Sequence, residues 1–288
     1  MKLGFIGLGS LGTPIALNLV ESGHELYVYN RTASKVAPLA EKGAIVCESI
    51  ADLAKECTIV FTIVSDDAAL KSICEGENGL FRHLAAGSIH VSLSTILPAT
   101  AKELADGHLP HQQHYLASPV FGRPEAAAAR KLNYVVAGPG SLKQKIEPLL
   151  KDSGATGIWD FGEDITAANT VKLCGNFLIA AALEAIGESV ALADKSGVDA
   201  ARMWQLFGQT LFNTPLYHNY SNIIVQQKFE PAAFTMQLGL KDMNLVLQQA
   251  GSVKQAMPLA SLLKDHMQQL AAGGKDQIDW SAVATATR

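Results

Sequence analysis

Residues 3–19, LGFIGLGSLGTPIALNL, decide the fold that we expect for this chain. A short apolar run leads into the glycine pattern G-x-G-x-x-G at residues 7–12, and apolar residues at helical spacing follow as far as Gly23. This order predicts a buried strand, a tight turn and then a helix. Pro14 falls in the first helical turn, where its missing N–H costs little.

The three glycines have the spacing that a dinucleotide requires. Gly7 allows a tight turn, Gly9 lets a pyrophosphate approach the backbone, and Gly12 lets helix and strand pack closely. The phosphates would lie at the N-terminus of the following helix, beside Ser10 and Leu11, where backbone N–H groups favour negative charge. A plain glycine turn is the alternative, but the strand before it and the helix after it favour a dinucleotide site.

As far as Gly162, strand-like runs alternate with helical ones. Residues 57–64, CTIVFTIV, are continuously apolar, which is typical of a strand buried on both faces of a parallel sheet. The other strand candidates are 25–30, 44–49, 87–94, 114–122 and 133–138. The alternation predicts an α/β Rossmann domain with a doubly wound, mainly parallel sheet.

After Gly162 the pattern changes to long helical stretches, with no convincing alternating strand. These stretches are 166–196, 199–210, 232–250 and 257–271. We therefore expect a Rossmann domain over residues 1–162 and an all-helical domain over residues 163–288. The first helix is far longer than usual, which is typical of a helix that joins domains or lies along a subunit interface.

The composition favours a globular, enzyme-like chain. Of its 288 residues, 48% are hydrophobic and 17% are charged, which excludes a disordered chain or a charged coiled coil. The net charge of −4 argues against nucleic acid as a partner. The low charged fraction suggests additional buried surface between domains or subunits.

The sequence also suggests where the protein resides. The 4 cysteines lack metal-site and disulfide-framework spacing, so we expect free thiols in a reducing compartment, the cytoplasm. Glycines interrupt the apolar start and argue against a signal peptide. The apolar stretch 177–193 contains Glu184 and Glu188 and is too short to span a bilayer, so we expect no membrane partner.

The end of the second predicted strand distinguishes NADP from NAD. An NAD site has Asp or Glu there for the ribose hydroxyls, whereas this chain has Asn30, Arg31 and Thr32. A carboxylate would repel a 2′-phosphate, but Arg31 can bind one through two parallel N–H groups, with Asn30 and Thr32 as further donors. We therefore expect NADP(H) in preference to NAD(H). An ordinary solvated arginine is the alternative.

A lysine on the long apolar helix is a candidate for proton transfer. Asn169, Lys172 and Asn176 lie three and four residues apart, so they share one helix face. A lysine there must extend to solvent, find a partner or line a polar cleft, and burial in a cleft suits it to proton transfer. A structural lysine is the alternative. Cys174 should point elsewhere, and we expect it to pack.

Two further groups of charged and histidine residues support less specific predictions. Lys241 lies at helical spacing between apolar residues, next to Asp242, and taken alone the two resemble a surface ion pair. His108, His111 and His114 form an H-x-x-H-x-x-H pattern, but Pro110 breaks any helix that would align them, so we expect a surface loop and no metal.

Taken together, these segments resemble the β-hydroxyacid dehydrogenase family, typified by 3-hydroxyisobutyrate dehydrogenase and the glyoxylate/succinic semialdehyde reductases. GFIGLGSLGTPIALNL is similar to the family's opening signature, and VSLSTILPAT to its serine-threonine segment. SPVFGRPEAAAARKL resembles the substrate loop, VKLCGNF the catalytic lysine-asparagine segment, and FTMQLGLKD the C-terminal lysine-aspartate motif. The motifs follow the family's order over nearly the whole chain.

The resemblance implies roles for individual residues. Lys172 would be the general acid/base and Asn176 would orient the substrate. Ser94 would contact substrate or nicotinamide, and Lys241 would close over the cofactor and substrate. Val64 and Ser65 lie in the family's nucleotide loop, followed by Asp66 and Asp67, which point apart and make a poor acid/base pair. The resemblance also implies a cleft between the domains, and a homodimer or homotetramer built on the helical domain.

The chain departs from the family in its substrate loop. Phe121, Gly122 and Arg123 stand where the family usually has Ser-Gly-Gly, which binds a carboxylate. Arg123 is either a replacement anion clamp or a surface partner of Glu125. The segment before Lys172 lacks the usual glycine pair and in that respect resembles the imine reductases, which usually lack the lysine.

We therefore expect an NADP-dependent oxidoreductase that transfers hydride between nicotinamide and a small β-hydroxy acid, semialdehyde or 2-oxo acid. Reduction of a C=N bond is the first alternative. A catalytically silent NADP-binding scaffold, which the altered substrate loop would allow, is the second.

Overall fold

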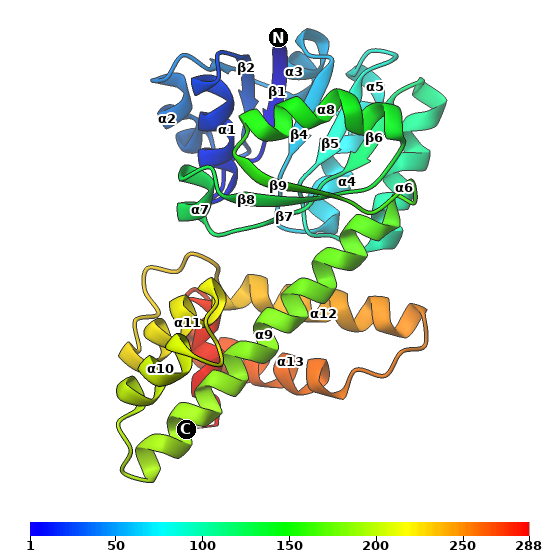
Figure 1. Ribbon diagram of the computed structural model, residues 1–288. Helices are drawn as coiled ribbons and strands as arrows, with labels where there is room; N and C mark the ends of the chain where they lie inside the picture. Colours follow the sequence, from blue (N-terminus) through cyan, green and yellow to red (C-terminus); the bar gives the residue numbers. More distant parts are fainter. Residues whose placement is uncertain (288) are drawn as a thin grey trace. The chain divides into compact units, whose positions relative to one another are not determined.

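The computed structural model describes residues 1–287, which divide between Lys172 and Leu173 into two compact units (Figure 1). The first unit holds the sheets, and the second unit is helical. The longest helix, α9 (Thr166–Lys195), contains the point of division.

The first unit is built on a six-stranded parallel sheet. Its strands are β1 (Lys2–Ile6), β2 (Glu25–Tyr29), β3 (Ile45–Val46), β4 (Ile59–Thr62), β5 (Ile89–Ser92) and β6 (His114–Ala117). Their order across the sheet is β3-β2-β1-β4-β5-β6, and every neighbouring pair is parallel. The chain thus winds outward from β1 in both directions, which confirms the predicted doubly wound fold.

Helices cover both faces of this sheet. They are α1 (Gly12–Glu21), α2 (Ala37–Ala40), α3 (Ile50–Glu56), α4 (Asp67–Glu75), α5 (Leu80–His83), α6 (Pro98–His108), α7 (Pro124–Ala128) and α8 (Gly140–Asp152). Leu3 and Phe5 of β1 pack into a cluster with α1 and α8, while Ile6 joins a second cluster with α3, α4 and α6. Successive strand residues point to opposite faces, so one short apolar strand contributes to both clusters.

A second, three-stranded sheet interrupts the simple alternation. It has the order β7-β8-β9, with β7 (Val120–Phe121) antiparallel to β8 (Leu132–Val136) and β9 (Ala155–Asp160) parallel to it. The single strand expected over 114–122 is therefore wrong, because it divides at Pro119, which has no N–H to donate to a ladder. No strand was expected at β9, because its residues are mostly exposed or half-buried and do not form an apolar run.

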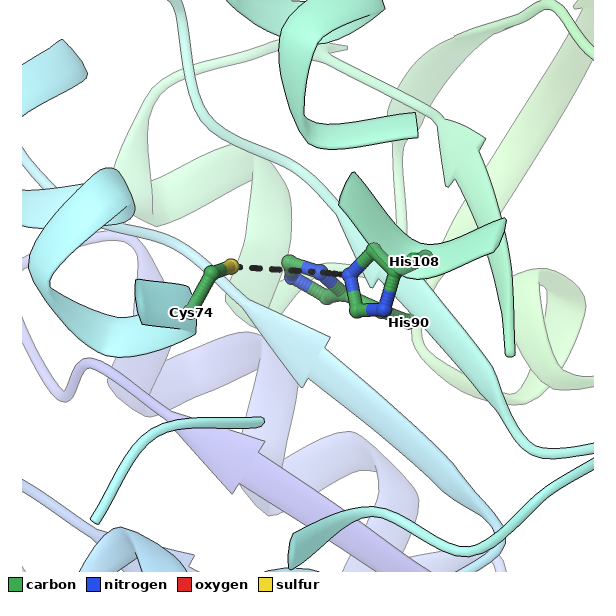
Figure 2. Close-up of side chains that lie close together, drawn as sticks. All are labelled: Cys74, His90 and His108. Atoms are coloured by element: carbon green, nitrogen blue, oxygen red, sulfur yellow. Dashed lines mark hydrogen bonds between the residues drawn. The ribbon is translucent and has the colours of Figure 1, made fainter. Parts of the chain in front are cut away.

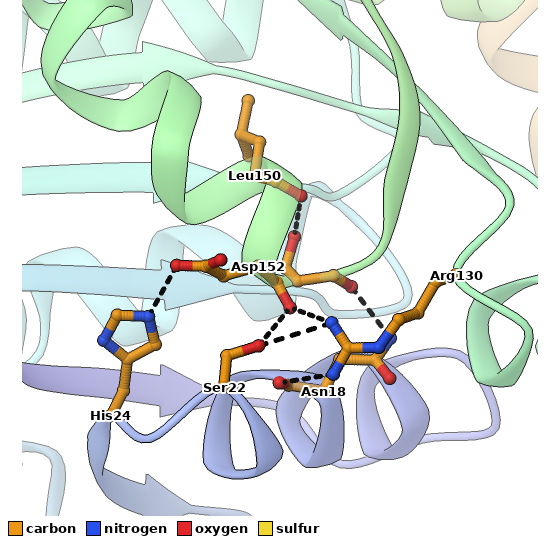
Figure 3. Close-up of polar contacts among 7 residues, drawn as sticks. Asn18, Ser22, His24, Arg130, Leu150 and Asp152 are labelled. Atoms are coloured by element: carbon orange, nitrogen blue, oxygen red, sulfur yellow. Dashed lines mark hydrogen bonds and ion pairs between the residues drawn. The ribbon is translucent and has the colours of Figure 1, made fainter.

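Side-chain hydrogen bonds tie the ends of α7 and α8 to α1 (Figure 3). The Asn18 side-chain amide donates to the backbone carbonyls of Ala127 and Ser153 at 2.9 and 3.0 Å. The Arg130 guanidinium donates to the carbonyls of Asn18 and Asp152 at 3.1 and 3.0 Å. These bonds fix the second sheet and its helices against the helix that follows the glycine turn.

In the second unit, helices follow one another with short connections. They are the later part of α9, then α10 (Ala200–Gln209), α11 (Pro215–Gln226), α12 (Met236–Ser252) and α13 (Pro258–Leu270), followed by a 3₁₀ turn at Trp280–Thr285. No residue from 173 to 287 lies in a strand, as expected. Helix α11 was not predicted from the sequence, because its aromatic, β-branched and polar residues have modest helix propensity.

Close packing holds the 3₁₀ turn in the helical unit. The Trp280 indole N–H donates to the Tyr220 hydroxyl at 3.0 Å. A side chain at Gly187 of α9 would lie 2.5 Å from the backbone of Ala284, so glycine permits this close approach. By length and composition α9 could cross a membrane, a property that buried helices of soluble proteins share.

A chain of polar side chains crosses the otherwise apolar core of the first unit, and Figure 2 shows its two histidines, His90 and His108, with Cys74. The Gln113 amide nitrogen donates to the carbonyls of Leu80, Phe81 and Leu84, so its oxygen accepts from His108 Nδ1 at 2.7 Å. Because burial keeps the His108 ring neutral, its Nε2 accepts from His90 Nδ1 at 3.0 Å. His90 Nε2 in turn accepts from the Thr62 hydroxyl at 2.8 Å. Burial lowers the pKa of both histidines, so both imidazoles are neutral here, each with one donor and one acceptor nitrogen.

This arrangement changes the interpretation of the histidine pattern. His108 is fully buried at the end of α6, so the surface loop expected for it is wrong, whereas His111 and His114 are exposed. Cys74 Sγ lies 3.7 Å from His90 Nδ1, and these two residues with His108 bring three potential metal ligands within 4.8 Å of one another. The hydrogen-bond chain accounts for all four ring nitrogens without an ion.

The buried pair should make the first unit sensitive to weak acid. Burial lowers the pKa of His90 well below the ordinary 6.5 and that of His108 to about 4. Unfolded histidines bind protons below pH 6.5 while the folded pair stays neutral, so the free energy of unfolding should fall as the pH drops toward 4. Each histidine should lower the free energy of unfolding by up to about 1.4 kcal/mol per pH unit. Urea unfolding between pH 7 and 5 will measure this slope.

Two variants serve as comparisons for this measurement. His90→Gln removes one buried ring and should flatten the slope, and His114→Gln, at an exposed position, should leave it as in the wild type. A free energy of unfolding that stays constant between pH 7 and 5 would contradict the neutral pair.

Candidate functional site

The glycine turn brings the ends of β1 and β4 against the start of α1. Gly7 has a φ of 102°, and a Cβ there would lie 2.0 Å from the carbonyl oxygen of Ile63. A Cβ at Gly12 would lie 2.1 Å from the carbonyl oxygen of Gly7, so neither position has room for a side chain. A Cβ at Gly9 would meet no described atom within 4 Å. Gly9 therefore borders open space beside the turn.

The N-terminus of α1 carries no side-chain cap. Leu11 occupies the cap position and makes no side-chain hydrogen bond to the first turn, and the first turn has no acidic residue. The positive end of the helix dipole favours an anion at this place. The residues thus fit the pyrophosphate of a dinucleotide.

A pocket of about 360 Å³ lies beyond the carboxyl end of β2. Its lining residues are Tyr29, Asn30, Arg31, Ala33, Val36, Val46, Cys47 and Glu48. The side-chain oxygen of Asn30 accepts from the backbone N–H of Leu8 at 2.8 Å, and its nitrogen donates to the carbonyl of Thr32 at 2.9 Å. Asn30 thereby connects the glycine turn to the pocket. Arg31 lines the pocket and is exposed, while Thr32 is exposed outside its lining.

The loops after β4 and β5 are joined by a predicted site residue. The buried Ser94 hydroxyl accepts from the backbone N–H of Val64 at 2.9 Å. The Ser65 hydroxyl donates to Asp66, whose other oxygen accepts from Ala69 N–H as the N-cap of α4. Asp67 accepts from Leu97 N–H at 2.9 Å. The two adjacent acids thus hold backbone at different places and do not form an acid/base pair.

Phe121, Gly122 and Arg123, the residues that resemble the substrate loop, lie at the end of the short strand β7 and directly after it. Phe121 ends this strand, and Gly122 has a φ of 145° with Leu132 2.4 Å from any added Cβ. Arg123 is half-buried, and its Nε lies 3.8 Å from a carboxylate oxygen of Glu125. The ion pair that the sequence analysis considered for Arg123 is therefore present in this structure.

Lys172 is buried on α9 and lies against an aromatic ring. Its Nζ is 4.1 Å from the centroid of the Phe121 ring, and 9% of the residue is exposed. Asn169, three residues earlier on the same helix, is also buried, and its side-chain oxygen accepts no hydrogen bond from the described residues. Cys174 is exposed, so the packing role expected for it is wrong.

The second unit contains a compact polar group that the sequence analysis treated in separate pieces. The side-chain nitrogen of Asn176 donates to one oxygen of Asp242, and Lys241 Nζ lies 2.6 Å from the other. Asp242 is 1% exposed, so the surface ion pair suggested by the sequence is wrong. Asp242 is a site candidate that the sequence analysis missed. The sequence feature that could have identified it is an acidic residue beside the apolar stripe of α12.

Two glycine substitutions should separate nucleotide binding from folding. Gly12→Ala should lower the Tm, because its methyl group would meet backbone. Gly9→Ala should leave the Tm unchanged and weaken NADPH binding about tenfold or more, the equivalent of ~1.4 kcal/mol, because its methyl group enters the space beside the turn. Thermal melts and NADPH fluorescence titration measure the two effects. Gly140→Ala, at an open position on α8, should change neither, and full NADPH affinity in Gly9→Ala would contradict this placement.

Two known protein families match this chain, and their matches meet close to the boundary between the two units. Residues 2–167 match the NAD binding domain of 6-phosphogluconate dehydrogenase. Residues 166–287 match the NAD-binding region of NADP-dependent 3-hydroxyisobutyrate dehydrogenase. Between them the two matches cover nearly the whole chain.

Individual relatives span the same length. The uncharacterized oxidoreductase YfjR of Bacillus subtilis is 42% identical, over 98% of both chains. The 2-hydroxy-3-oxopropionate reductase of Escherichia coli is 29% identical, over 99% of this chain and 97% of its own.

Solved structures agree with these matches. The 3-hydroxyisobutyrate dehydrogenase of Mycobacterium tuberculosis with L-serine is 25% identical, over 100% of this chain and 99% of its own, with a TM-score of 0.88. An imine reductase of Myxococcus stipitatus with NADP⁺, 18% identical over 100% of both chains, shares the fold with a TM-score of 0.69. The glycine turn, the uncapped helix and these full-length matches lead to one conclusion: the chain belongs to the β-hydroxyacid dehydrogenase family and is an NAD(P)-dependent oxidoreductase.

Proposed function

We propose that this enzyme transfers hydride between NADP(H) and a small β-hydroxy acid, semialdehyde or 2-oxo acid, with Lys172 as the general acid/base. The observation that carries the proposal is the buried Lys172, whose ammonium lies against the Phe121 ring in a unit that also holds the glycine turn. Lysine is otherwise found at the surface, and a buried one on an apolar helix needs a local reason.

The residues around the glycine turn fit a dinucleotide. The open space at Gly9 and the uncapped N-terminus of α1 would accept the pyrophosphate, and the pocket beside Arg31 would accept the adenosine end. Ser94 and Val64, joined by their hydrogen bond, would border the nicotinamide end. When bound, the nicotinamide supplies or accepts the hydride.

The chain's own contribution to the reaction is proton transfer and positioning. In reduction, the Lys172 ammonium gives a proton to the carbonyl oxygen as that oxygen becomes a hydroxyl. In oxidation, the neutral amine takes the hydroxyl proton. Such help is typically worth about 10²–10⁴-fold in rate. Asn176, held by Asp242, would orient the substrate, which increases the rate further.

The loop and the relatives both support the proposed substrate class. Arg123, beside Gly122, would bind an anionic group of the substrate by exchanging its contact with Glu125 for a stronger paired hydrogen bond. The relatives named above act, by their names, on 2-hydroxy-3-oxopropionate and 3-hydroxyisobutyrate, both small hydroxy or oxo acids.

We also propose that the enzyme is a cytoplasmic homodimer or homotetramer. Large apolar side chains of the helical unit are exposed, namely Leu178, Leu192, Val198, Leu206 and Leu211. Apolar side chains in this number on one all-helical unit favour a subunit interface.

Substitution of Arg31 tests the preference for NADP. Arg31→Ala should weaken NADPH binding by about ten- to a hundredfold, the usual range for a lost hydrogen bond to a charged group, and should change NADH binding little. Fluorescence titration with both cofactors measures the difference. Lys35→Ala, which removes an exposed cation that does not line the pocket, is the matched control. Equal effects of Arg31→Ala on both cofactors would overturn the preference.

Substitution of Lys172 tests the mechanism. Lys172→Met should lower kcat with a carbonyl substrate by about 10²-fold or more while NADPH affinity and Tm stay near those of the wild type. The assay is a panel of aldehydes, 2-oxo acids and cyclic imines with NADPH. Lys195→Met, at the exposed end of the same helix, is the control and should behave as the wild type.

Other results of this substrate panel would contradict the proposed mechanism or favour one of the alternative functions. Unchanged turnover of a carbonyl substrate by Lys172→Met would overturn the role of the lysine. Turnover of imines alone would favour a C=N reductase, and NADPH binding without any turnover would favour a silent scaffold.

A further inference from the structure

The Phe121 ring is held in place by the backbone on both of its sides. Strand β7 pairs with β8 through the partners Val120–Tyr134 and Phe121–Asn133. Immediately after Phe121, Gly122 adopts a φ of 145° that other residues rarely take, and Leu132 leaves no room for a side chain there. The ring also packs against the apolar cluster between the sheet and α3, α4 and α6. Its position is therefore set by the sheet and the core.

The Lys172 ammonium lies over this fixed ring. The distance from Nζ to the ring centroid is 4.1 Å, well within the range of about 6 Å over which an aromatic face attracts a cation. The attraction is strongest where water is excluded, and Lys172 is 9% exposed. The ring attracts the charged ammonium and has no comparable attraction for the neutral amine.

Few other charges lie on the elements that carry these two residues. Lys172 is the sole charged residue of α9 from Thr166 to Leu183. After β7, the charged groups are Arg123 at the N-cap of α7 and Glu125 in its first turn, whose side chains lie 3.8 Å apart. One turn further along α9, Asn176 contacts the buried Asp242 of α12, which pairs with Lys241. The ring is the aromatic contact of the ammonium among these charged and polar groups.

We propose that Phe121 is a positioning residue that holds the protonated form of Lys172 and raises the pH at which this lysine changes from proton donor to proton acceptor. The inference rests on the proposed role of Lys172 in the reaction. While the proton is on Nζ, the ring stabilises and orients it, and when the proton moves to the carbonyl oxygen this stabilisation is lost. The ring thus extends the pH range of reduction and moves oxidation to higher pH.

The test replaces the ring by an apolar side chain of similar size. In Phe121→Leu, the midpoint pH at which Lys172 becomes reactive toward an amine-specific acylating reagent should fall by about half a unit or more. Labelling across a pH series, followed by peptide mass spectrometry, measures this midpoint on the free protein. The upper pH limit of reduction and the lower pH limit of oxidation should move in the same direction by a similar amount.

Two variants separate this effect from a loss of packing. Phe121→Tyr keeps the aromatic face and should keep the wild-type midpoint. Phe161→Leu changes an exposed phenylalanine after β9 and should also leave the midpoint unchanged. Phe121→Met is a second apolar replacement should Phe121→Leu fail to fold, as judged by thermal melting.

The outcomes distinguish this inference from the proposed function. If activity falls in both apolar variants while the Lys172 midpoint stays at the wild-type value, Phe121 is merely a packing residue and the inference is overturned. If Lys172→Met retains full turnover, the proposed mechanism fails whatever the labelling shows. A lowered midpoint in Phe121→Leu with an inactive Lys172→Met supports both.

Discussion

The close approach of three backbone segments at Gly7, Gly12 and Ile63 is the constraint on which the first unit depends. Carbonyl oxygens occupy the places where side chains at the two glycines would begin, so β1, β4 and α1 pack there backbone to backbone. The first turn of α1 follows this approach and carries no side-chain cap, so the positive end of its dipole is available to an anion. One packing constraint thus creates both the centre of the sheet and the place proposed for the phosphates.

Around this centre, polar side chains fix the loops at the carboxyl ends of the strands. Asn30 links the loop after β2 to the glycine turn, and Ser94 links the loops after β4 and β5. In a parallel sheet these loops lie at one edge, which is where open α/β sheets bind their ligands. Deeper in the same unit, Thr62 and His90 connect β4 and β5 through a fully satisfied hydrogen-bond chain. Neutral, buried partners of this kind rigidify a core without placing a charge in it.

Much of the fold and the cofactor site could be predicted from local patterns. Strand, turn and helix at the N-terminus are encoded by residues that are neighbours in the chain, as are the apolar run of β4 and the helical spacing of α9, α12 and α13. The pattern was less informative at β7 and β9, where short or exposed strands lack a continuous apolar run. It also failed at α11, whose residues have modest helix propensity and become helical through packing, as at Tyr220 beneath Trp280.

By itself, the sequence determined the doubly wound sheet, the glycine turn and the candidate lysine, because periodicity and turn chemistry act between residues close in the chain. Only the tertiary structure decided which distant side chains meet. It placed the Phe121 ring against Lys172, brought Asp242 to Asn176 and buried His108 beside His90. Such pairings depend on strand order and on how elements pack, and a one-dimensional pattern does not encode those distances. The contact between the lysine and the ring is therefore one that no local motif contains.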